Sequence, residues 1–245
     1  NQSSMKTKKT TMLALLDGDI FCYRVGFATQ EEPEAIALHR IKEMVEGCLA
    51  EVGATEYRIF LTGTDNFRYG INPEYKANRA DKPKPIHLKA LREYLVKQFN
   101  AEVVDGMEAD DAMAINQSGD SIICTIDKDL LQVEGHHYNF VKKEFQVIER
   151  LEGLRKFYTQ FLTGDKADNI IGIEGIGPVK ADRALAGYYT EQEMFDKVRG
   201  MYDNDERLLM NGRCLYMKRT LEDDWKETFD RLVGRSTEEL HNLDS

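Results

Sequence analysis

The chain has 245 residues, 42% of them hydrophobic, which is enough for one large domain, or a domain with a smaller appendage, around a substantial core. Its cysteines are far apart and form no C-x-x-C pair, which argues against a zinc site or a disulfide framework. No apolar run reaches the roughly 20 residues that cross a bilayer, and the first ten residues lack a signal-peptide core. We therefore expect a cytoplasmic protein without membrane contact, and the residues ahead of Met5 are excluded from the fold.

The net charge of −10 on its own disfavours a nucleic-acid binder, because phosphate contacts require positive charge. The basic residues, however, are concentrated in one stretch, where only Asp81 and Glu93 oppose them. This stretch is either a phosphate-facing surface or the solvated face of a helix and its leading loop. Its members are Lys76, Arg79, Lys82, Lys84, Lys89, Arg92 and Lys97.

Short apolar runs alternate with helical patterns through the first 150 residues. Residues 12–16, 57–61 and 121–126 each form an apolar run that stops at a turn, which is typical of buried strands. Residues 34–52 carry apolar positions at helical spacing between the first two runs. The pattern predicts an α/β fold whose mostly parallel central sheet is flanked by helices. Ligands of such sheets gather at the carboxyl ends of the strands.

The chain after Leu154 shows no strand pattern and predicts a smaller helical region. A glycine-rich turn at residues 172–177 interrupts it. Residues past Trp225 are polar, and we expect them to be mobile or loosely docked. The predicted organisation is an α/β core at 11–150 and a helical region at 151–245 that form one integrated unit.

Acidic residues cluster in three places that the predicted fold can bring together. One cluster opens a helical pattern, a second follows the third strand, and a third repeats the three-residue spacing of a helix face. Each cluster alone is more typical of a helix cap or a turn than of a ligand set. The clusters are Glu108, Asp110 and Asp111; Asp127 and Asp129; and Asp165 and Asp168.

Several carboxylates in one place repel each other and need cations to offset their charge. Mg²⁺ and Mn²⁺ prefer oxygen ligands, and two such ions about 4 Å apart promote phosphodiester hydrolysis by water. No phosphate-binding loop with the Gly-x-x-x-x-Gly-Lys pattern is present, so the sequence gives no indication of nucleoside triphosphate hydrolysis.

The glycine-rich turn has a separate interpretation. Gly175 and Gly177 leave backbone amides open to a phosphate ahead of a predicted helix, and Lys180 adds a positive charge. The turn is either a clamp for a DNA backbone or an ordinary connection between two helices.

At this point the residues resemble a known family, the 5′ nucleases, which include flap endonucleases, the N-terminal nuclease of DNA polymerase I and free-standing bacteriophage 5′ exonucleases. The resemblance runs from about residue 13 to 184, and the chain is most similar to the phage enzymes. Its landmarks follow the family's order: residues 16–19, 66–68 with 75–79, 108–111, 125–130, 164–170 and the glycine turn.

The resemblance implies a PIN-like fold with a helical arch around residues 66–97 and a helix-hairpin-helix clamp in the helical region. It places Asp17, Glu108, Asp110, Asp127 and Asp129 around a first metal, and Asp165 and Asp168 around a second. Asp111 would bridge or support both groups and is counted as catalytic.

The resemblance also assigns residues to the substrate. Lys76 and Arg79 would steer the scissile phosphate as catalytic residues, and Tyr75 would offer a face on which a terminal base stacks. Lys82, Lys84, Gly175, Gly177 and Lys180 would contact DNA. The two glycines would also border a K⁺ ion. The implied cofactors are two Mg²⁺ or Mn²⁺ ions.

One position departs from the family pattern. Relatives carry an aspartate just after the second strand, whereas residues 60–65 place Gly63 there. Asp19, Asp65 or water would have to fill the gap.

The resulting hypothesis is a metal-dependent 5′-3′ exonuclease or flap endonuclease that cuts DNA at 5′ ends, nicks or flaps, and also RNA in RNA–DNA hybrids. It would act as a monomer, inside a phage-infected cell if the source is a phage. Two alternatives remain open: a catalytically inactive nuclease fold that binds DNA as a scaffold, and an RNase with a similar acidic site.

Overall fold

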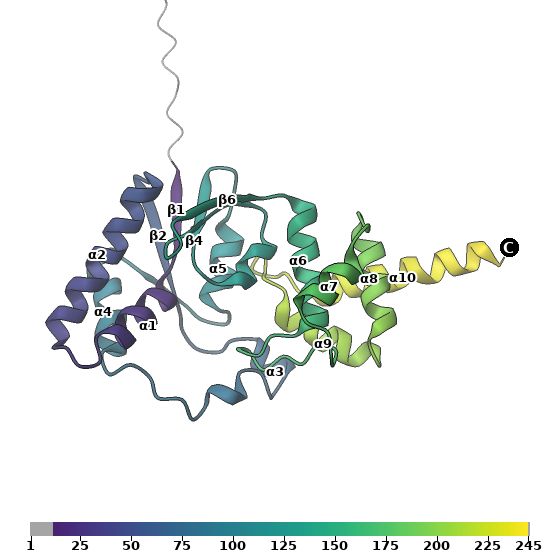
Figure 1. The fold of residues 1–245 in the computed structure, drawn as a ribbon, viewed down its shortest axis with the longest axis horizontal. Helices are drawn as coiled ribbons and strands as arrows, with labels where there is room; N and C mark the ends of the chain where they lie inside the picture. Colours follow the sequence, from purple (N-terminus) through teal and green to yellow (C-terminus); the bar gives the residue numbers. More distant parts are fainter. Residues whose placement is uncertain (1–11, 245) are drawn as a thin grey trace, which may run out of the picture.

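The computed structural model describes residues 12–244, so the stretch ahead of Met5 lies outside it. A six-stranded sheet forms the first half of the molecule, and helices form the second (Figure 1). The strand order is β3-β2-β1-β4-β5-β6, and every pair is parallel except the antiparallel pair β5–β6. The strands are β1 (Leu13–Asp17), β2 (Glu56–Thr62), β3 (Glu102–Val104), β4 (Ser121–Cys124), β5 (Gly135–Asn139) and β6 (Glu144–Ile148).

The mostly parallel sheet flanked by helices that the sequence predicts is confirmed. The three predicted strands correspond to β1, β2 and β4, with ends that differ by up to two residues, and the predicted helix at 34–52 is α2. The sequence analysis does not predict β3, β5 or β6.

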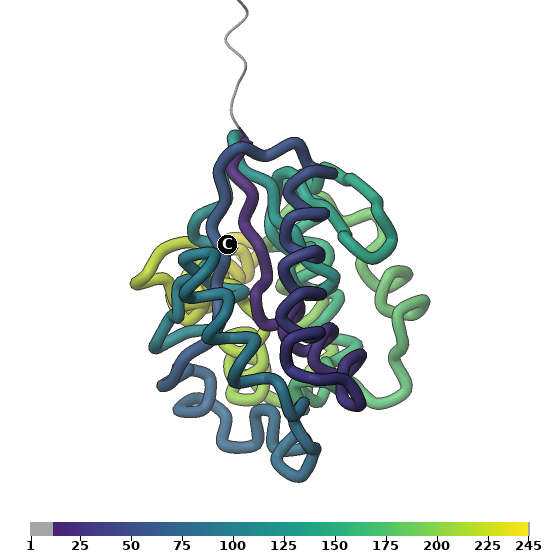
Figure 2. Tube along the Cα trace, turned by 90° about the vertical axis from the view of Figure 1, so that its left-hand side faces the viewer, coloured from purple at the N-terminus to yellow at the C-terminus, as the bar shows by residue number. Residues whose placement is uncertain are grey.

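Successive residues of the central strands enter two different cores. Leu16 of β1 packs beneath α1, α2 and α4, while its neighbour Leu15 packs beneath α5 on the opposite face. Figure 2 shows α2 running alongside β1 on the first of these faces. Helices therefore cover both faces of the sheet. These helices are α1 (Gly18–Ala28), α2 (Glu34–Val52), α4 (Leu88–Phe99) and α5 (Ala109–Asn116).

A third core lies among the later helices, where an aromatic cluster surrounds Phe157, Phe161 and Trp225. Tyr75, from the segment that follows β2, is buried in the same core. The helices are α6 (Arg150–Thr163), α7 (Pro178–Leu185), α8 (Glu191–Met201), α9 (Asp205–Leu215) and α10 (Trp225–Leu243).

The prediction of a mobile or loosely docked tail past Trp225 is wrong for its first half. Trp225, Phe229 and Leu232 recur at helical spacing, and all three are buried against the later helices. The end of α10 projects away from the body, with Leu240 and Leu243 exposed (Figure 1).

The segment between β2 and α4 runs along the lower edge of the molecule in the ribbon of Figure 1 and in the tube of Figure 2. It contains two short helical turns, α3 (Arg68–Ile71) and the 3-10 helix η1 (Ala77–Arg79). A second 3-10 helix, η2 (Lys128–Gln132), follows β4. Among the helices of residues 12–244, none has both the length and the apolar character that crossing a membrane requires.

Candidate metal centre

Two adjacent strands end on carboxylates at the same edge of the sheet. Asp17 is the last residue of β1, and its carboxylate caps α1 through Ile20 N at 3.3 Å and accepts from the Thr125 hydroxyl at 2.8 Å. Asp127 follows β4 and caps η2 by accepting from Asp129 N at 2.9 Å. Because β1 and β4 are parallel neighbours, their ends bring these two acids together.

Asp110 joins them from the first turn of α5. Burial, followed by repulsion from Asp127 and Asp17, raises the pKa of Asp110 well above its ordinary value. Burial, followed by repulsion from Asp19 and Asp127, raises the pKa of Asp17 to about 8. These carboxyl groups therefore hold protons that a divalent cation could displace.

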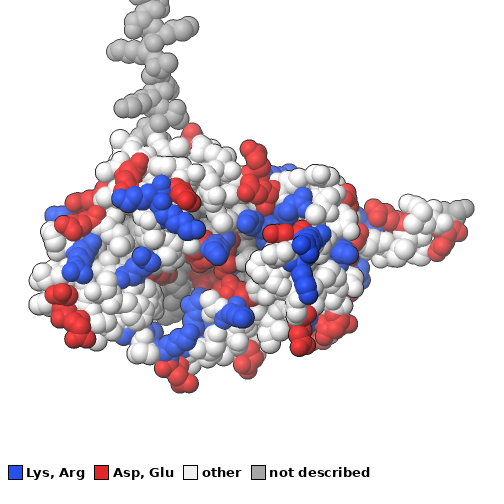
Figure 3. Space-filling model, viewed as in Figure 1, with Lys and Arg blue, Asp and Glu red and all other residues white. Residues whose placement is uncertain are grey.

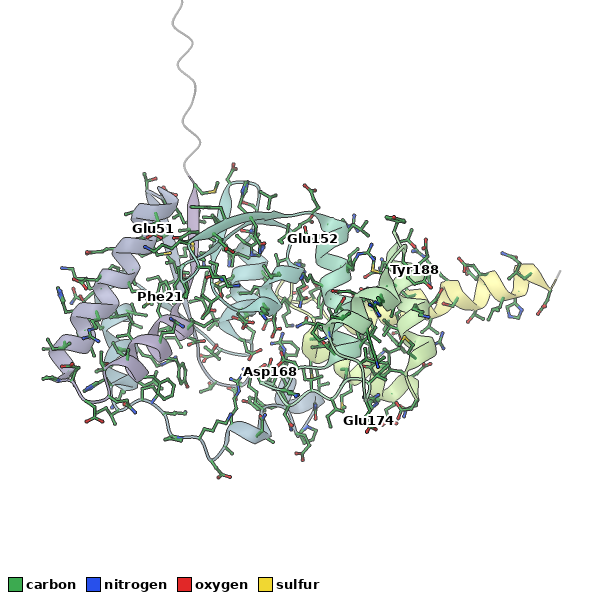
Figure 4. The ribbon with its side chains drawn as sticks, in the orientation of Figure 1. Phe21, Glu51, Glu152, Asp168, Glu174 and Tyr188 are labelled. Carbon is green, nitrogen blue, oxygen red and sulfur yellow. The ribbon has the colours of Figure 1, made fainter. Side chains whose placement is uncertain are left out.

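A second acidic group lies beside the first. Ligand oxygens of Asp129, Asp165 and Asp168 all lie within 4.8 Å of one another. Burial and neighbouring carboxylates raise the pKa of Asp129 to about 9 and that of Asp168 to about 6. In Figure 4, Asp168 lies between the sheet and the later helices, so residues from both halves form the site.

Asp129 is placed differently from the expectation. The resemblance puts it with Asp127 around the first metal, whereas the structure groups it with Asp165 and Asp168. The cause is local: η2 begins directly after Asp127, so the chain turns instead of staying extended. Gln160 of α6 also donates to the Asp129 carboxylate.

Glu108 connects the acidic site to basic residues. Its carboxylate accepts from Lys76 and from the Tyr75 hydroxyl at 3.0 Å, and it pairs with Arg68 Nη1 at 2.8 Å. Burial acts to raise the pKa of Glu108, but the Arg68 and Lys76 cations outweigh it and lower that pKa. Glu108 is therefore ionised beside carboxyl groups whose pKa values are raised, such as those of Asp17 and Asp110.

Asp111 is fully buried and does not face the site as a catalytic residue would. Its two oxygens accept from Arg68 Nη1 at 2.6 Å and Nη2 at 2.8 Å, and also from the backbone of Glu108 and Lys218. The geometry makes Asp111 a positioning residue that fixes the start of α5, which agrees with the supporting role among the two expected and differs from a metal bridge or a catalytic residue.

Lys76 and Arg79 lie at the site as expected. The Lys76 ammonium contacts Glu108 and lies 3.8 Å from an Asp168 oxygen, while Arg79 Nη2 lies 3.0 Å from the same oxygen. Burial acts to lower the pKa of Lys76, yet Glu108 and Asp168 raise it overall, so this ammonium stays charged.

Tyr75 differs from its expected role. Its ring is buried, only 2% exposed, and its hydroxyl is bonded to Glu108, so it offers no open face to a terminal base. Its position instead fixes the Glu108 carboxylate.

The predicted DNA-contacting residues are exposed. Lys82 and Lys84 lie in the segment before α4, Gly175 and Gly177 in the turn before α7, and Lys180 on α7. Gly175 adopts a φ of +79°, which favours glycine. Figure 3, which views the molecule as in Figure 1, shows acidic side chains within a central hollow and Lys and Arg side chains around it. Positive and negative side chains are thus separated on the surface, although the net charge is negative.

Gly63 directly follows β2, at the position where the family resemblance leads us to expect an acid. A Cβ added there would lie 2.1 Å from Asp105 Oδ1 and 2.8 Å from Val104 O, so the backbone leaves no room for a side chain. Asp65 is exposed in a left-handed conformation and bonds Thr64. Asp19 instead reaches the end of β2 and bonds Thr62.

Sequence reasoning missed several supporting residues. Arg68 lies in one of the family landmarks, at residues 66–68, but the sequence alone assigns it no role, although an arginine ahead of a cluster of acids is compatible with a buried pair. Thr125 and Gln160 carry no pattern that distinguishes them from other polar residues.

Two adjacent groups of buried and partly buried carboxylates at the carboxyl edge of a mostly parallel sheet, faced by lysine and arginine, are typical of the class of metal-dependent phosphodiesterases. The family model described as "5'-3' exonuclease, N-terminal resolvase-like domain" matches residues 12–159. The chain belongs to this 5′-3′ exonuclease family.

Curated relatives are similar over most of the chain. A 5'-3' exonuclease of Buchnera aphidicola subsp. Schizaphis graminum is 26% identical over 82% of this chain and 76% of its own length. A flap endonuclease Xni of Shewanella sp. (strain W3-18-1) is 28% identical over 60% of this chain and 63% of its own length. The DNA polymerase I of Chloroflexus aurantiacus is 28% identical over 76% of this chain, which spans only 23% of that polymerase.

Solved structures share the fold. The T5 D15 protein co-crystallised with metal ions superposes with a TM-score of 0.67 at 17% identity, over 83% of this chain and 88% of that one. A zinc-bound T5 5'-exonuclease gives 0.60 at 19% identity over 81% of this chain and 83% of that one. The catalytic core of Rad2 in complex with DNA substrate gives 0.53 at 17% identity over 87% and 81% of the two chains.

Proposed function

We propose that this chain hydrolyses phosphodiester bonds of DNA at 5′ ends, nicks or flaps, as a 5′-3′ exonuclease or flap endonuclease, and also acts on RNA in RNA–DNA hybrids. The observation that carries the proposal is the pair of carboxylate groups at the sheet edge, which Lys76 and Arg79 face. Relatives named for 5′-3′ exonuclease and flap endonuclease activity support it.

Two Mg²⁺ or Mn²⁺ ions fit these residues, because the acids are close together and partly or fully buried, and because burial beside like charges raises the pKa values of Asp17 and Asp129. Asp17, Asp110 and Asp127 would hold one ion with Glu108 nearby, and Asp129, Asp165 and Asp168 the other. Bound there, the ions would supply Lewis acidity to the scissile phosphate and to water.

The basic residues would then act on the substrate. Lys76 and Arg79 would leave their contacts with Glu108 and Asp168 and bind the non-bridging oxygens of the phosphate, since cations that enter the site take over the carboxylates. Their fixed positive charge would favour the negative charge that develops during cleavage.

Contacts beyond the cut site would come from the exposed residues. Lys82 and Lys84 would bind the backbone near the arch, and the turn before α7 would work as a helix-hairpin-helix clamp. Open amides near Gly175 and Gly177 and the Lys180 charge suit a phosphate, and K⁺ would bind between loop carbonyls and that phosphate.

We infer that the regions 11–150 and 151–245 work as one monomeric unit. Arg68 donates to the carbonyls of Cys214 and Tyr216, and Gln132 donates to Leu215 O, so α3 and η2 are both tied to the end of α9.

The direct test is cleavage of a 5′-flap duplex and a nicked duplex, each labelled at either end, with Mg²⁺, Mn²⁺ or chelator. Metal-dependent mononucleotides from the nick would establish an exonuclease, and a released intact flap would establish an endonuclease. Salt-dependent binding without a cut product would favour the inactive scaffold, an alternative that the lack of an acid at Gly63 supports. Cleavage of RNA alone would favour the RNase.

A further inference from the structure

Asp19 places a carboxylate at the end of β2, a strand that supplies no acid of its own. Asp19 belongs to the first turn of α1, and its Oδ2 accepts from Thr62 N at 3.1 Å and from the Thr62 hydroxyl at 2.6 Å. The contact joins elements that are 43 positions apart in the sequence.

Gly18 makes this reach possible. A Cβ at Gly18 would lie 2.6 Å from Phe60 O and 2.8 Å from Leu61 Cδ2, so only glycine lets the start of α1 lie this close to β2. Asp17 and Asp19 consequently point to two different places: Asp17 to the ends of β1 and β4, and Asp19 to the end of β2.

The Thr62 hydroxyl connects Asp19 to the backbone of the metal centre. It donates to Asp19 and accepts from Ala109 N at 2.9 Å. Ala109 stands between Glu108 and Asp110, so this bond fixes the backbone that carries both acids.

Arg92 of α4 binds both partners of this contact, Asp19 and Thr62. Its Nη1 donates to Asp19 Oδ1 at 3.1 Å and its Nη2 to Thr62 O at 2.8 Å. Both oxygens of the Asp19 carboxylate are therefore hydrogen-bonded, Oδ1 to Arg92 and Oδ2 to Thr62.

We propose that Asp19 is a positioning residue for the metal centre: through the Thr62 hydroxyl it fixes the start of α5, and so the Glu108 and Asp110 carboxylates, in the absence of an acid at position 63. The inference rests on the proposed function. Hydrogen-bonded groups behind metal ligands commonly change metal affinity by about 10- to 100-fold when removed.

The test is a Mn²⁺ titration of the intact protein, read by the electron paramagnetic resonance of the free ion. Asp19→Ala and Thr62→Val are each expected to weaken Mn²⁺ binding by about 10-fold, and Thr62→Ser, which keeps the hydroxyl, to retain wild-type affinity. Because both changes break one chain of bonds, the double variant should bind no more weakly than Thr62→Val alone.

Asp105→Ala is the matched control. Asp105 accepts from Thr64 N at 2.8 Å and from the Thr64 hydroxyl at 3.2 Å, the same kind of contact one strand away, but Thr64 makes no bond to α5. This variant should bind Mn²⁺ like the wild type. If Asp19→Ala does not fold, as thermal unfolding would show, the Thr62→Val and Thr62→Ser pair carries the test alone.

Unchanged Mn²⁺ affinity in folded Thr62→Val would overturn the inference. Losses of affinity in the two single variants that add up in the double variant would overturn it as well. In either case, cleavage of DNA by the wild type would still support the proposed function. A wild type that neither binds Mn²⁺ nor cuts DNA would instead overturn the proposed function.

Discussion

At the scale of single residues, the centre is dominated by carboxyl groups that hold protons because they are buried together. Burial first, and neighbouring acids second, raise the pKa values of Asp17 and Asp129 to about 8 and about 9. Glu108 is the exception, since Arg68 and Lys76 lower its pKa. The site therefore changes charge in the weakly alkaline range.

This produces a testable link between pH and metal. A carboxyl whose pKa is higher in the folded protein than its unfolded value of 3.8 favours folding at low pH, and this contribution is lost as pH rises toward about 8 to 9. Mn²⁺ replaces the protons, so the rise in melting temperature that it causes should be larger at about pH 8.5 than at about pH 6. Thermal unfolding with and without Mn²⁺ at both values measures this. A rise independent of pH would count against protonated ligands.

Tyr75→Phe separates a positioning role from base stacking. The change keeps the aromatic ring but removes the hydroxyl that donates to Glu108. We expect Mn²⁺ affinity to fall by about 10-fold, because the Glu108 carboxylate loses a hydrogen bond that holds it in place. If stacking on DNA is the role, Mn²⁺ affinity will stay at the wild-type value.

The acids themselves could be predicted from the sequence because their spacing and their places after strands are visible there. Their partners could not. Asp19 bonds Thr62, and Asp129 joins Asp165, through contacts that only the three-dimensional packing creates.

At the scale of elements, Arg68 joins the segment between β2 and α4 to both α5 and α9. Its side chain is fully buried, pairs with Asp111 and Glu108, and donates to Cys214 O at 2.7 Å. Removing it would leave the buried Asp111 carboxylate without a cation and the Glu108 carboxylate with Lys76 alone.

Arg68→Met should therefore lower the free energy of unfolding by about 3 to 5 kcal/mol, as expected when one partner of a buried pair is removed. Arg58→Met is the control, because the Arg58–Glu102 pair is substantially exposed and worth at most about 1 kcal/mol. Urea unfolding measures both. Equal losses in the two variants would contradict the role given to Arg68.

Element prediction succeeded where the hydrophobic period is clear. The strands β1, β2 and β4 are rich in apolar residues, with Arg58 as an interruption in β2, and α2 has apolar residues at helical spacing. The strand β3 is only three residues long, and four of the five residues of β6 are exposed, so neither has a pattern that a buried strand would show.

At the scale of the whole molecule, a net charge of −10 coexists with a surface suited to DNA because acids fill the hollow and basic residues surround it (Figure 3). The net charge taken alone disfavours a nucleic-acid partner, and only the distribution of the charges in the folded chain separates the two signs.

Replacing Lys82 and Lys84 together by alanine should weaken DNA binding and reduce the slope of log affinity against log salt by about 2, since each phosphate contact contributes about 0.9. Fluorescence anisotropy with a labelled flap duplex over a salt series measures this. The control replaces Lys197 and Lys226, which are exposed on α8 and α10. A slope that changes equally in both variants would show that Lys82 and Lys84 make no particular contact.

The central claim is that the carboxylates at the sheet edge perform metal-dependent cleavage. The most direct measurement compares the Mg²⁺-dependent cleavage rate of a labelled nicked duplex by wild type, by Asp127→Asn with Asp129→Asn, and by Asp65→Asn, an exposed acid outside both groups. The account predicts at least a ~100-fold loss in the double variant, because one ligand is removed from each group, and a wild-type rate in Asp65→Asn. Cleavage at the wild-type rate by the folded double variant would contradict it.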